Sequence, residues 1–250
     1  MAHLKRIANH LILFLFLLML AISSCTSDLS NGKLDKLSFL NAGIEINQST
    51  TSKADNSVVV TLVDKDGNRI SNDSLLIFVN GIQEKLTHKQ GLYYSNESVY
   101  VFSNVPVNER YNVEIKLTDG KKYFLGSVKA LAEEKPGNIE CKEAGDLNDD
   151  FEIKWHGLID IDELSVFIGM TEQTEPNVTS ATNQDEKIIK INSNGSFKIS
   201  KAEYKKAKAN ISGIEFNFRT TKNGTVNPEL LKNSHITIKT RIEKYVDFGE

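Results

Sequence analysis

The stretch RYNVEIKLTDGKKYFLGSV, residues 110–128, contains the pattern that decides the fold. In its first half, apolar and polar side chains alternate with the two-residue period of a strand that has one buried and one solvated face. The apolar positions are Tyr111, Val113, Ile115 and Leu117. Asp119 and Gly120 then form a pair typical of tight hairpin turns, and a second apolar run follows. The stretch therefore predicts a β-hairpin.

The same unit of a short strand followed by a turn recurs upstream. Residues 57–63 (SVVVTLV) form a β-branched run that ends near Asp66 and Gly67, and residues 75–79 end at Asn80 and Gly81. Between residues 37 and 131 we count about seven short strands separated by turn residues, a spacing typical of a β-sandwich. Residues 37–131 are therefore predicted to form a first sandwich domain.

A change of composition marks the boundary of a second domain. Residues 132–138 (AEEKPGN) combine charge with proline and glycine and are predicted to be a linker. Beyond them, Phe151, Ile153 and Trp155 alternate with polar residues. Further strand patterns are expected at residues 164–168, 188–191, 196–199, 214–218 and 235–245, and one or two helical turns at 201–208. Residues 139–250 are therefore predicted to form a second sandwich.

Three stretches resemble a known family of sandwiches. FEIKW (151–155) followed by ELSVFIG (163–169) resembles the early strands of fibronectin type III and related immunoglobulin-like domains. NERYNVEIKL (108–117) is similar to the tyrosine-bearing strand of these domains. The resemblance implies an all-β protein of two tandem immunoglobulin-like β-sandwiches. Such domains serve mostly as spacers or binding modules, and fold alone does not determine function.

The N-terminus has the three parts of a secretory signal peptide. Lys5 and Arg6 precede an apolar run at 11–22, which is too short for the roughly 20 residues of a membrane span. The tetrad ISSC, residues 22–25, resembles the lipobox of bacterial lipoproteins. The resemblance implies removal of residues 1–24, lipidation of Cys25 and a polar tether at 25–36. The alternative is an ordinary cleaved signal that contains a cysteine.

The residues after Cys25 favour one membrane. An acidic residue directly after the lipidated cysteine favours inner-membrane retention in enteric bacteria, but Thr26 occupies that position. A polar segment containing Asp28 is similar to surface-exported lipoproteins of the Bacteroidetes. We therefore expect a lipid-anchored protein of the bacterial cell envelope, at the outer membrane.

Composition excludes several classes of function. Without Lys5 and Arg6 the processed chain has 28 basic and 33 acidic residues, a net charge of −5, so it lacks the basic footprint of a nucleic-acid-binding protein. Besides Cys25 the sequence contains only Cys141, so no intrachain disulfide is expected once Cys25 is lipidated. Cys141 is interpreted as a small buried apolar residue, with a reactive or intermolecular thiol as the alternative.

One acidic segment has partial calcium-loop spacing. Asp146, Asn148 and Asp150 match the first ligand positions of such a loop, but Phe151 replaces the required glycine and Gly157 the bidentate glutamate. An acidic turn before a strand is therefore the preferred interpretation. The histidines at 88, 156 and 235 have no metal-ligand spacing, and no nucleophile or phosphate-binding motif occurs. We expect neither enzymatic activity nor a cofactor.

Together these features predict an envelope lipoprotein with a non-enzymatic binding or structural role at the cell surface. One alternative is a carbohydrate-binding accessory lipoprotein of a glycan-uptake system, which requires exposed aromatic side chains. Tyr93, Tyr94, Tyr100 and Phe102 lie on neighbouring predicted strands, where core packing is the favoured interpretation. Another alternative is an adhesin or fimbrial component, which requires an unpaired sheet edge that accepts a partner strand.

Overall fold

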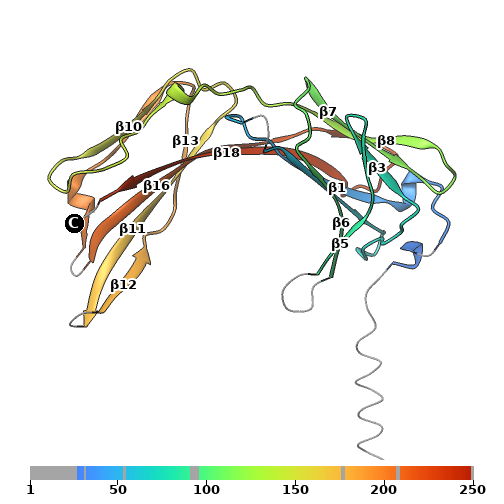
Figure 1. Ribbon diagram of the computed structural model, residues 1–250, viewed down its shortest axis with the longest axis horizontal. Coiled ribbons are helices and arrows are strands. Elements are labelled where there is room, and N and C mark those ends of the chain that lie inside the picture. Colours follow the sequence, from blue (N-terminus) through green and yellow to red (C-terminus); the bar gives the residue numbers. More distant parts are fainter. Residues whose placement is uncertain are drawn as a thin grey trace, which may run out of the picture.

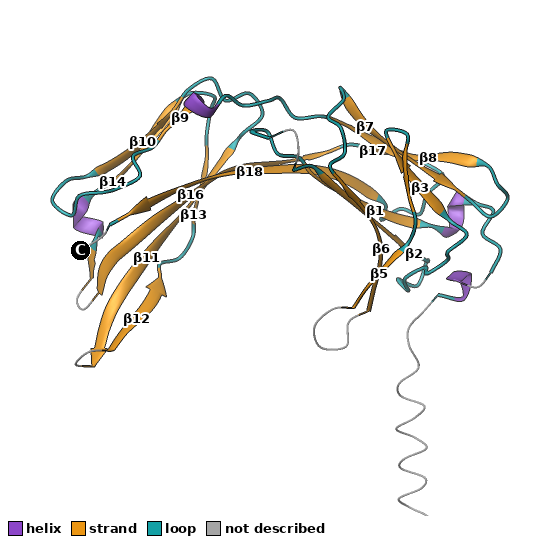
Figure 2. Ribbon diagram, in the orientation of Figure 1, coloured by secondary structure: helices purple, strands orange, loops and turns teal. Residues whose placement is uncertain are grey.

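The computed structural model describes residues 27–30, 32–52, 55–90, 96–175, 178–206 and 209–248. These residues form an arch with two lobes (Figure 1), and the expected all-β class is confirmed. Across the described ranges, one ten-stranded sheet follows the concave side of the arch, and two smaller sheets cover its convex side. The helical segments are short 3-10 turns: η1 (Asp28–Ser30), η2 (Leu37–Phe39), η3 (Pro136–Asn138) and η4 (Lys201–Glu203) (Figure 2).

Lobe 1 is the sandwich built around the first half of the chain. Its concave sheet contains β1 (Asn41–Asn47), β2 (Ser57–Val63), β6 (Asn96–Ser103) and β5 (Thr87–Gln90), in that spatial order. The facing sheet contains β8 (Lys122–Lys129), β7 (Arg110–Lys116), β3 (Leu76–Val79) and β4 (Ile82–Glu84). With strands lettered along the chain, these orders are A-B-E-D and G-F-C-C′, the arrangement of an immunoglobulin-like sandwich.

The hairpin predicted at residues 110–128 is present as β7 and β8. Its alternating apolar positions all point into the core of lobe 1, and Tyr111, Val113 and Ile115 have no exposed surface. Gly120 adopts a φ of 81°, which glycine accepts without strain, at the turn between the two strands. Burial raises the pKa of Tyr111 to about 12, so its phenol is neutral at physiological pH.

Lobe 2 is a second sandwich with its own core. Its convex sheet has the order β14-β10-β9, and its concave part the order β12-β11-β16-β18. These strands are β9 (Ile139–Glu140), β10 (Phe151–Trp155), β11 (Glu163–Glu175), β12 (Val178–Asn183), β14 (Gly195–Ile199), β16 (Ala209–Asn223) and β18 (His235–Asp247). Two short strands, β13 (Lys187–Lys190) and β15 (Lys205–Lys206), pair with β11 and β16.

Aromatic contacts dominate the core of lobe 2. As predicted, Phe151, Ile153 and Trp155 of β10 point inward. The Trp155 ring meets Phe218 edge-on at 5.5 Å between centroids, and its indole N–H donates to the carbonyl of Asn192 at 2.9 Å. Edge-on aromatic pairs add about 0.5–1.5 kcal/mol beyond the burial of their surface.

The predicted helical segment at 201–208 is shorter than expected. Ser200 caps a single 3-10 turn by accepting a hydrogen bond from the backbone N–H of Ala202. The chain then pairs as β15 with β16, with Lys205 opposite Asn210, so ladder hydrogen bonds replace helical ones there. Residues 207 and 208 lie outside the described ranges.

The division of the chain at 132–138 needs one correction. The segment between β16 and β18 leaves lobe 2 and completes lobe 1, where β17 (Thr225–Val226) pairs with β8. The first half of β18 pairs in parallel with β1, from Gly43 opposite His235 to Asn47 opposite Lys239. Leu230, Ile236 and Ile238 consequently lie in the core of lobe 1, whereas the sequence pattern predicts them in the second domain. We call residues 224–239 the closing segment.

Two glycines allow the closing segment to approach lobe 1 closely. A Cβ atom at Gly224 would lie 2.3 Å from the carbonyl oxygen of Ser127. A Cβ atom at Gly126 would lie 2.9 Å from the carbonyl oxygen of Thr225. Neither position has room for a side chain, so the contact between β8 and β17 depends on both glycines.

The linker residues 132–138 are also fixed by partly buried hydrogen bonds. Glu134 is 2 % exposed, and its carboxylate accepts from the backbone N–H of Ile159 and the side-chain amide of Asn138. Asp160 accepts from the backbone N–H of Ala132 at 2.6 Å and forms an ion pair with Lys222 of β16. The two lobes are therefore joined by the linker as well as by the shared sheet.

Candidate binding site

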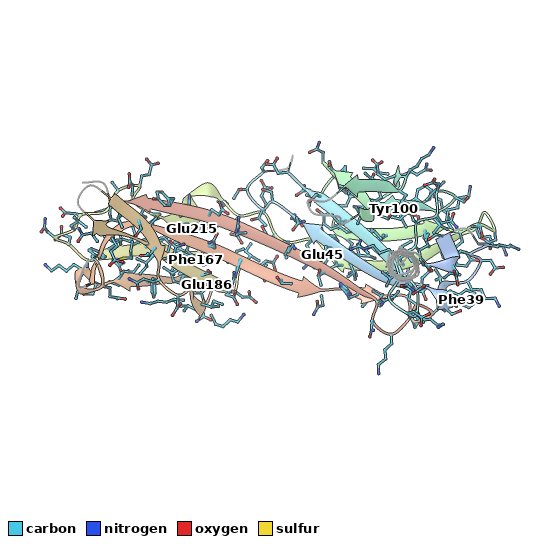
Figure 3. The ribbon with its side chains drawn as sticks, turned by 90° about the horizontal axis from the view of Figure 1, so that it is seen from below. Phe39, Glu45, Tyr100, Phe167, Glu186 and Glu215 are labelled. Atoms are coloured by element: carbon cyan, nitrogen blue, oxygen red, sulfur yellow. The ribbon has the colours of Figure 1, made fainter. Side chains whose placement is uncertain are left out.

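The outer side of the ten-stranded sheet forms the concave face of the arch. Along β18 the even-numbered residues such as Ile236, Ile238 and Val246 are buried, so the odd-numbered residues face outward. Figure 3 shows this face, with Phe167, Glu186 and Glu215 on lobe 2 and Glu45 on lobe 1. The concave face is thus a polar surface that crosses both lobes.

A charged cluster occupies the concave face of lobe 2, at the end that is nearer to lobe 1. Arg219 lies 2.5 Å from Glu163 and 3.1 Å from Glu186, and Lys190 lies 3.0 Å from Glu163. Hydrogen bonds from Arg219 and Lys190 lower the pKa of Glu163. The Ser165 hydroxyl donates to Glu186 at 2.5 Å. These charges are paired with one another, so the cluster stiffens the sheet rather than offering free charge to a ligand.

A more open hollow lies on lobe 2 beside this cluster, and we call it the Tyr245 pocket. Its volume is about 470 Å³, within the range of small-molecule sites. Phe167 and Tyr245 contribute its aromatic walls, and Gly169 and Gly213 its floor. Tyr245 is 60 % exposed, the most exposed aromatic residue among the described large apolar side chains.

Polar side chains complete the rim of the Tyr245 pocket. Three of these groups form no hydrogen bond with another protein group of the described ranges: the Asn183 amide, the Ser212 hydroxyl and the Tyr245 hydroxyl. Glu215 accepts from the Asn217 amide at 2.7 Å, and Arg241 is paired with Glu243. The pocket therefore combines free neutral hydrogen-bonding groups with charges that are already partly neutralised.

The four aromatic residues that the sequence offered for glycan binding do not contribute to the Tyr245 pocket in the described part of the chain. Tyr100 and Phe102 are each 1 % exposed and lie in the core of lobe 1, which confirms core packing for these two residues. Tyr93 and Tyr94 lie outside the described residues. Sequence reasoning missed Tyr245, although the signal was present: the isoleucines of HITIKTRIEKY mark one face, and Tyr245 falls on the other.

The acidic segment at Asp146, Asn148 and Asp150 forms a turn before β10, as preferred. Asp146 accepts from the backbone N–H of Asn148 at 2.8 Å. Asp150 accepts from the backbone N–H of Lys201 and pairs with Lys198 at 2.8 Å, and these contacts lower its pKa, with Lys198 the larger cause. Protein donors thus engage both carboxylates. In the described part of the chain, no group of three or more His, Cys, Asp or Glu residues is arranged to hold a metal ion.

Cys141 is half-buried and packs against the core of lobe 2. Its thiol donates weakly to the Lys142 carbonyl at 3.5 Å, and burial raises its pKa. A raised pKa keeps the thiol protonated and unreactive at neutral pH. His156 lies 3.7 Å from Glu140 and His235 contacts the Asn233 carbonyl, both on exposed surface. The side chain of His88 lies outside the described residues.

Cys25 lies outside the described residues, but the segment that follows it does not form a free tether. Ser27 is 3 % exposed, and its backbone N–H donates to the Arg69 carbonyl at 3.1 Å. The Asn72 amide donates to the carbonyls of Leu29 and Gly32. Leu34 is fully buried in the core of lobe 1. The predicted tether at 25–36 is therefore corrected: from Ser27 onward, its described residues are packed on lobe 1.

No helix in the described ranges has the length and apolar character that crossing a membrane requires. Neither a family model nor a curated protein sequence matches the chain.

Three solved structures show a weak likeness. One is trypsin-activated α-2-macroglobulin from Escherichia coli, with 9 % identity, a TM-score of 0.25, and coverage of 90 % of this chain and 17 % of that one. Another is SGBP-B of a Bacteroides ovatus mixed-linkage glucan utilization locus, in complex with a mixed-linkage heptasaccharide. Its identity is 12 % and its TM-score 0.24, with coverage of 89 % of this chain and 46 % of that one. A third is the Yersinia pseudotuberculosis adhesin InvE, with 10 % identity, a TM-score of 0.24, and coverage of 88 % of this chain and 61 % of that one. The chain spans less than two thirds of each, and these TM-scores establish no shared fold.

Proposed function

We propose that the protein is a lipoprotein of the bacterial cell envelope, anchored at the outer membrane through Cys25, with a non-enzymatic binding or structural role. The lipobox-like tetrad at residues 22–25 and the preceding signal pattern support the anchor. A lipid-anchored chain of this kind needs two or more acyl groups, because a single chain holds a protein only marginally.

The observation that carries the proposal is the tetrad at residues 22–25. The packing of the N-terminal segment on lobe 1 then determines where such an anchor would hold the protein. Cys25 precedes the buried residue Ser27 by two positions, a span of at most about 7 Å in an extended chain. A lipid on Cys25 would hold lobe 1 directly against the membrane surface. The strand β18 pairs with β1 of lobe 1 and continues into lobe 2, where it pairs with β16, and would support lobe 2 and its concave face beside the membrane.

The lipid anchor can be tested by substituting the cysteine that would carry it. We expect Cys25→Ala to leave the protein unprocessed or to release it from the membrane fraction, whereas Cys141→Ala should be processed and retained like the natural chain. Membrane fractionation and the mass of the mature N-terminus measure both effects. A Cys25→Ala protein that is cleaved before residue 25 and still sediments with membranes would refute the lipid anchor.

Protease treatment of intact cells then assigns the side of the membrane. Loss of a C-terminal tag, while a periplasmic control protein survives, would indicate that the lobes face outward. A tag that survives until the outer membrane is opened would indicate a periplasmic role in envelope support.

A second candidate function is glycan binding, and the exposed Tyr245 ring favours it. A glycan-binding accessory protein needs an aromatic surface that is open to solvent, and the Tyr245 pocket supplies one on the concave face.

A non-enzymatic role is part of the main proposal of an envelope lipoprotein. It is supported by the pairing of Glu163 and Glu186 with Arg219, which leaves these neighbouring carboxylates engaged within the protein.

A further inference from the structure

Tyr245 lies down across β16 because its neighbour there is a glycine. In the antiparallel register Tyr245 is opposite Glu215, and Gly213 is the next outward position along β16. A Cβ atom at Gly213 would lie 2.3 Å from the Tyr245 hydroxyl oxygen and 2.7 Å from Cζ. The phenol end of the ring thus covers Gly213, in the space that any side chain there would fill. The rest of the ring stays open to solvent.

A bulge shapes the floor beside Tyr245. The register between β11 and β16 shifts after Gly169, which pairs with Gly213, while Met170 pairs with Ile211. Ser212 is the extra residue, and a Cβ atom at Gly169 would lie 3.1 Å from its hydroxyl oxygen. Bulges of this kind redirect a side chain, and here the Ser212 hydroxyl turns toward the pocket. Neither Gly169 nor Gly213 has a side chain of its own, so Tyr245 and Ser212 can extend over this part of the sheet and form the edges of the pocket.

The charges around the pocket exclude several ligands. Arg241 is the cation that lines it, and Arg241 is paired with Glu243, while Glu215 contributes a further carboxylate. A phosphate or an acidic polymer would meet more negative than positive charge. An apolar peptide or lipid would leave the Asn183 amide and the Ser212 hydroxyl without hydrogen bonds, at a cost in free energy.

We infer that the Tyr245 pocket is a subsite for an uncharged carbohydrate, with one sugar ring packed against the exposed surface of Tyr245. The C–H groups on one face of a pyranose are weakly positive and pack on the electron-rich face of an aromatic ring. Sugar hydroxyls both donate and accept, so they match the Asn183 amide, the Ser212 hydroxyl and the Glu215 carboxylate. This inference deepens the glycan-binding candidate and does not depend on the lipid anchor.

The open shape of the site indicates a unit within a longer glycan. Arg241 lines both the Tyr245 pocket and a second groove of about 700 Å³. This groove is also lined by Asn47 and Lys239, which pair where β1 of lobe 1 meets β18. A chain that leaves the subsite along β18 would therefore continue over the concave face toward lobe 1.

The test is native affinity electrophoresis of the full chain in detergent, with a polysaccharide in the gel. The neutral probes are a β-glucan, an α-glucan, a xylan and a mannan, and the acidic probes are polygalacturonate and alginate. We expect at least one neutral probe to retard the protein and neither acidic probe to do so. Tyr245→Ala should weaken the retardation roughly tenfold or more, because an aromatic anchor carries a large share of binding energy.

Two further variants keep the test specific. Phe124→Ala removes another exposed aromatic side chain, on β8 of lobe 1, and should bind like the natural protein. Gly213→Ala should weaken binding by displacing the Tyr245 ring while the circular dichroism spectrum stays unchanged. Failure of all neutral probes to retard the natural protein, retardation by acidic probes alone, or equal losses in Tyr245→Ala and Phe124→Ala would overturn the inference. None of these results bears on the membrane fractionation of Cys25→Ala.

Discussion

Lobe 1 and lobe 2 are both immunoglobulin-like sandwiches, but they differ in what completes them. Within the described ranges, lobe 2 obtains all its strands from residues 139–223 and the second half of β18. Lobe 1 needs the closing segment, which adds β17 to one of its sheets and the first half of β18 to the other. The comparison shows that a domain can obtain strands from a segment that follows its neighbour in the sequence.

The hydrophobic cores of the two lobes also differ, in size and in the type of side chain. Lobe 1 has a large core of mainly aliphatic residues drawn from both ends of the chain. Lobe 2 has a smaller core in which aromatic rings fill the space beneath a convex sheet of only three described strands. The single tryptophan of the sequence, Trp155, lies in lobe 2, so its fluorescence reports on lobe 2 alone.

The largest effect should come from removing the closing segment. A chain that ends at residue 138 lacks Leu230, Ile236 and Ile238, each of which is worth about 1.5–3 kcal/mol when buried. Their combined loss is comparable with the whole stability of a small domain, about 5–15 kcal/mol. We expect this fragment to be unfolded by circular dichroism, with the full chain as the folded control. A fragment that unfolds cooperatively at the urea midpoint of the full chain would show that lobe 1 is independent.

A smaller effect should follow from crowding the contact of the closing segment. Gly224→Ala places a methyl group against the Ser127 carbonyl and should destabilise lobe 1 by about 1–3 kcal/mol. Gly137→Ala is the matched control, because no atom lies within 4 Å of that Cβ position. Hydrogen exchange of β7 and β8 should accelerate in Gly224→Ala only. Equal exchange in the two variants would contradict the dependence of lobe 1 on this contact.

Most strands and both sandwiches could be predicted from residue alternation, as at Tyr111 and Val113 or at Ile153 and Trp155. Alternation shows which face of a strand is buried, but it does not show which core the strand reaches. Ile236 and Ile242 lie on one face of β18, yet Ile236 packs in lobe 1 and Ile242 against lobe 2. The excursion of residues 224–239 was therefore hidden from the sequence.

The site was predictable to a smaller extent. The outward position of Tyr245 follows from the same alternation, but the hollow next to it requires the register that brings Gly213 and Gly169 together. Register between strands that are distant in the sequence is set by packing and by a bulge, and neither leaves a local pattern. The docking of Ser27 was likewise hidden, because polar residues that bond to backbone carbonyls look like a solvated tether.

The smallest expected effect concerns the coupling of the lobes through Asp160. Burial opposes ionisation of this carboxyl, but hydrogen bonds from Lys222 and from the N–H of Ala132 outweigh it, so the pKa is lowered from 3.8. A carboxyl with a lowered folded-state pKa stabilises the protein above its unfolded pKa, and the contribution is lost as pH falls through the folded value. Because the pair is partly exposed, we expect at most about 1 kcal/mol. Between about pH 5 and pH 3 the natural chain should therefore lose more stability than Asp160→Asn.

The control for this pH dependence is Asp66→Asn, which alters an exposed carboxylate that is paired with the adjacent Lys65. At each pH, Trp155 fluorescence during urea unfolding reports on lobe 2, and hydrogen exchange of β7 and β8 reports on lobe 1. If Asp160 couples them, the difference between natural chain and Asp160→Asn should occur with both probes, since Asp160 ties the linker at Ala132 to β16. A difference confined to Trp155 fluorescence would restrict the role of Asp160 to lobe 2 and leave the shared sheet as the connection that matters.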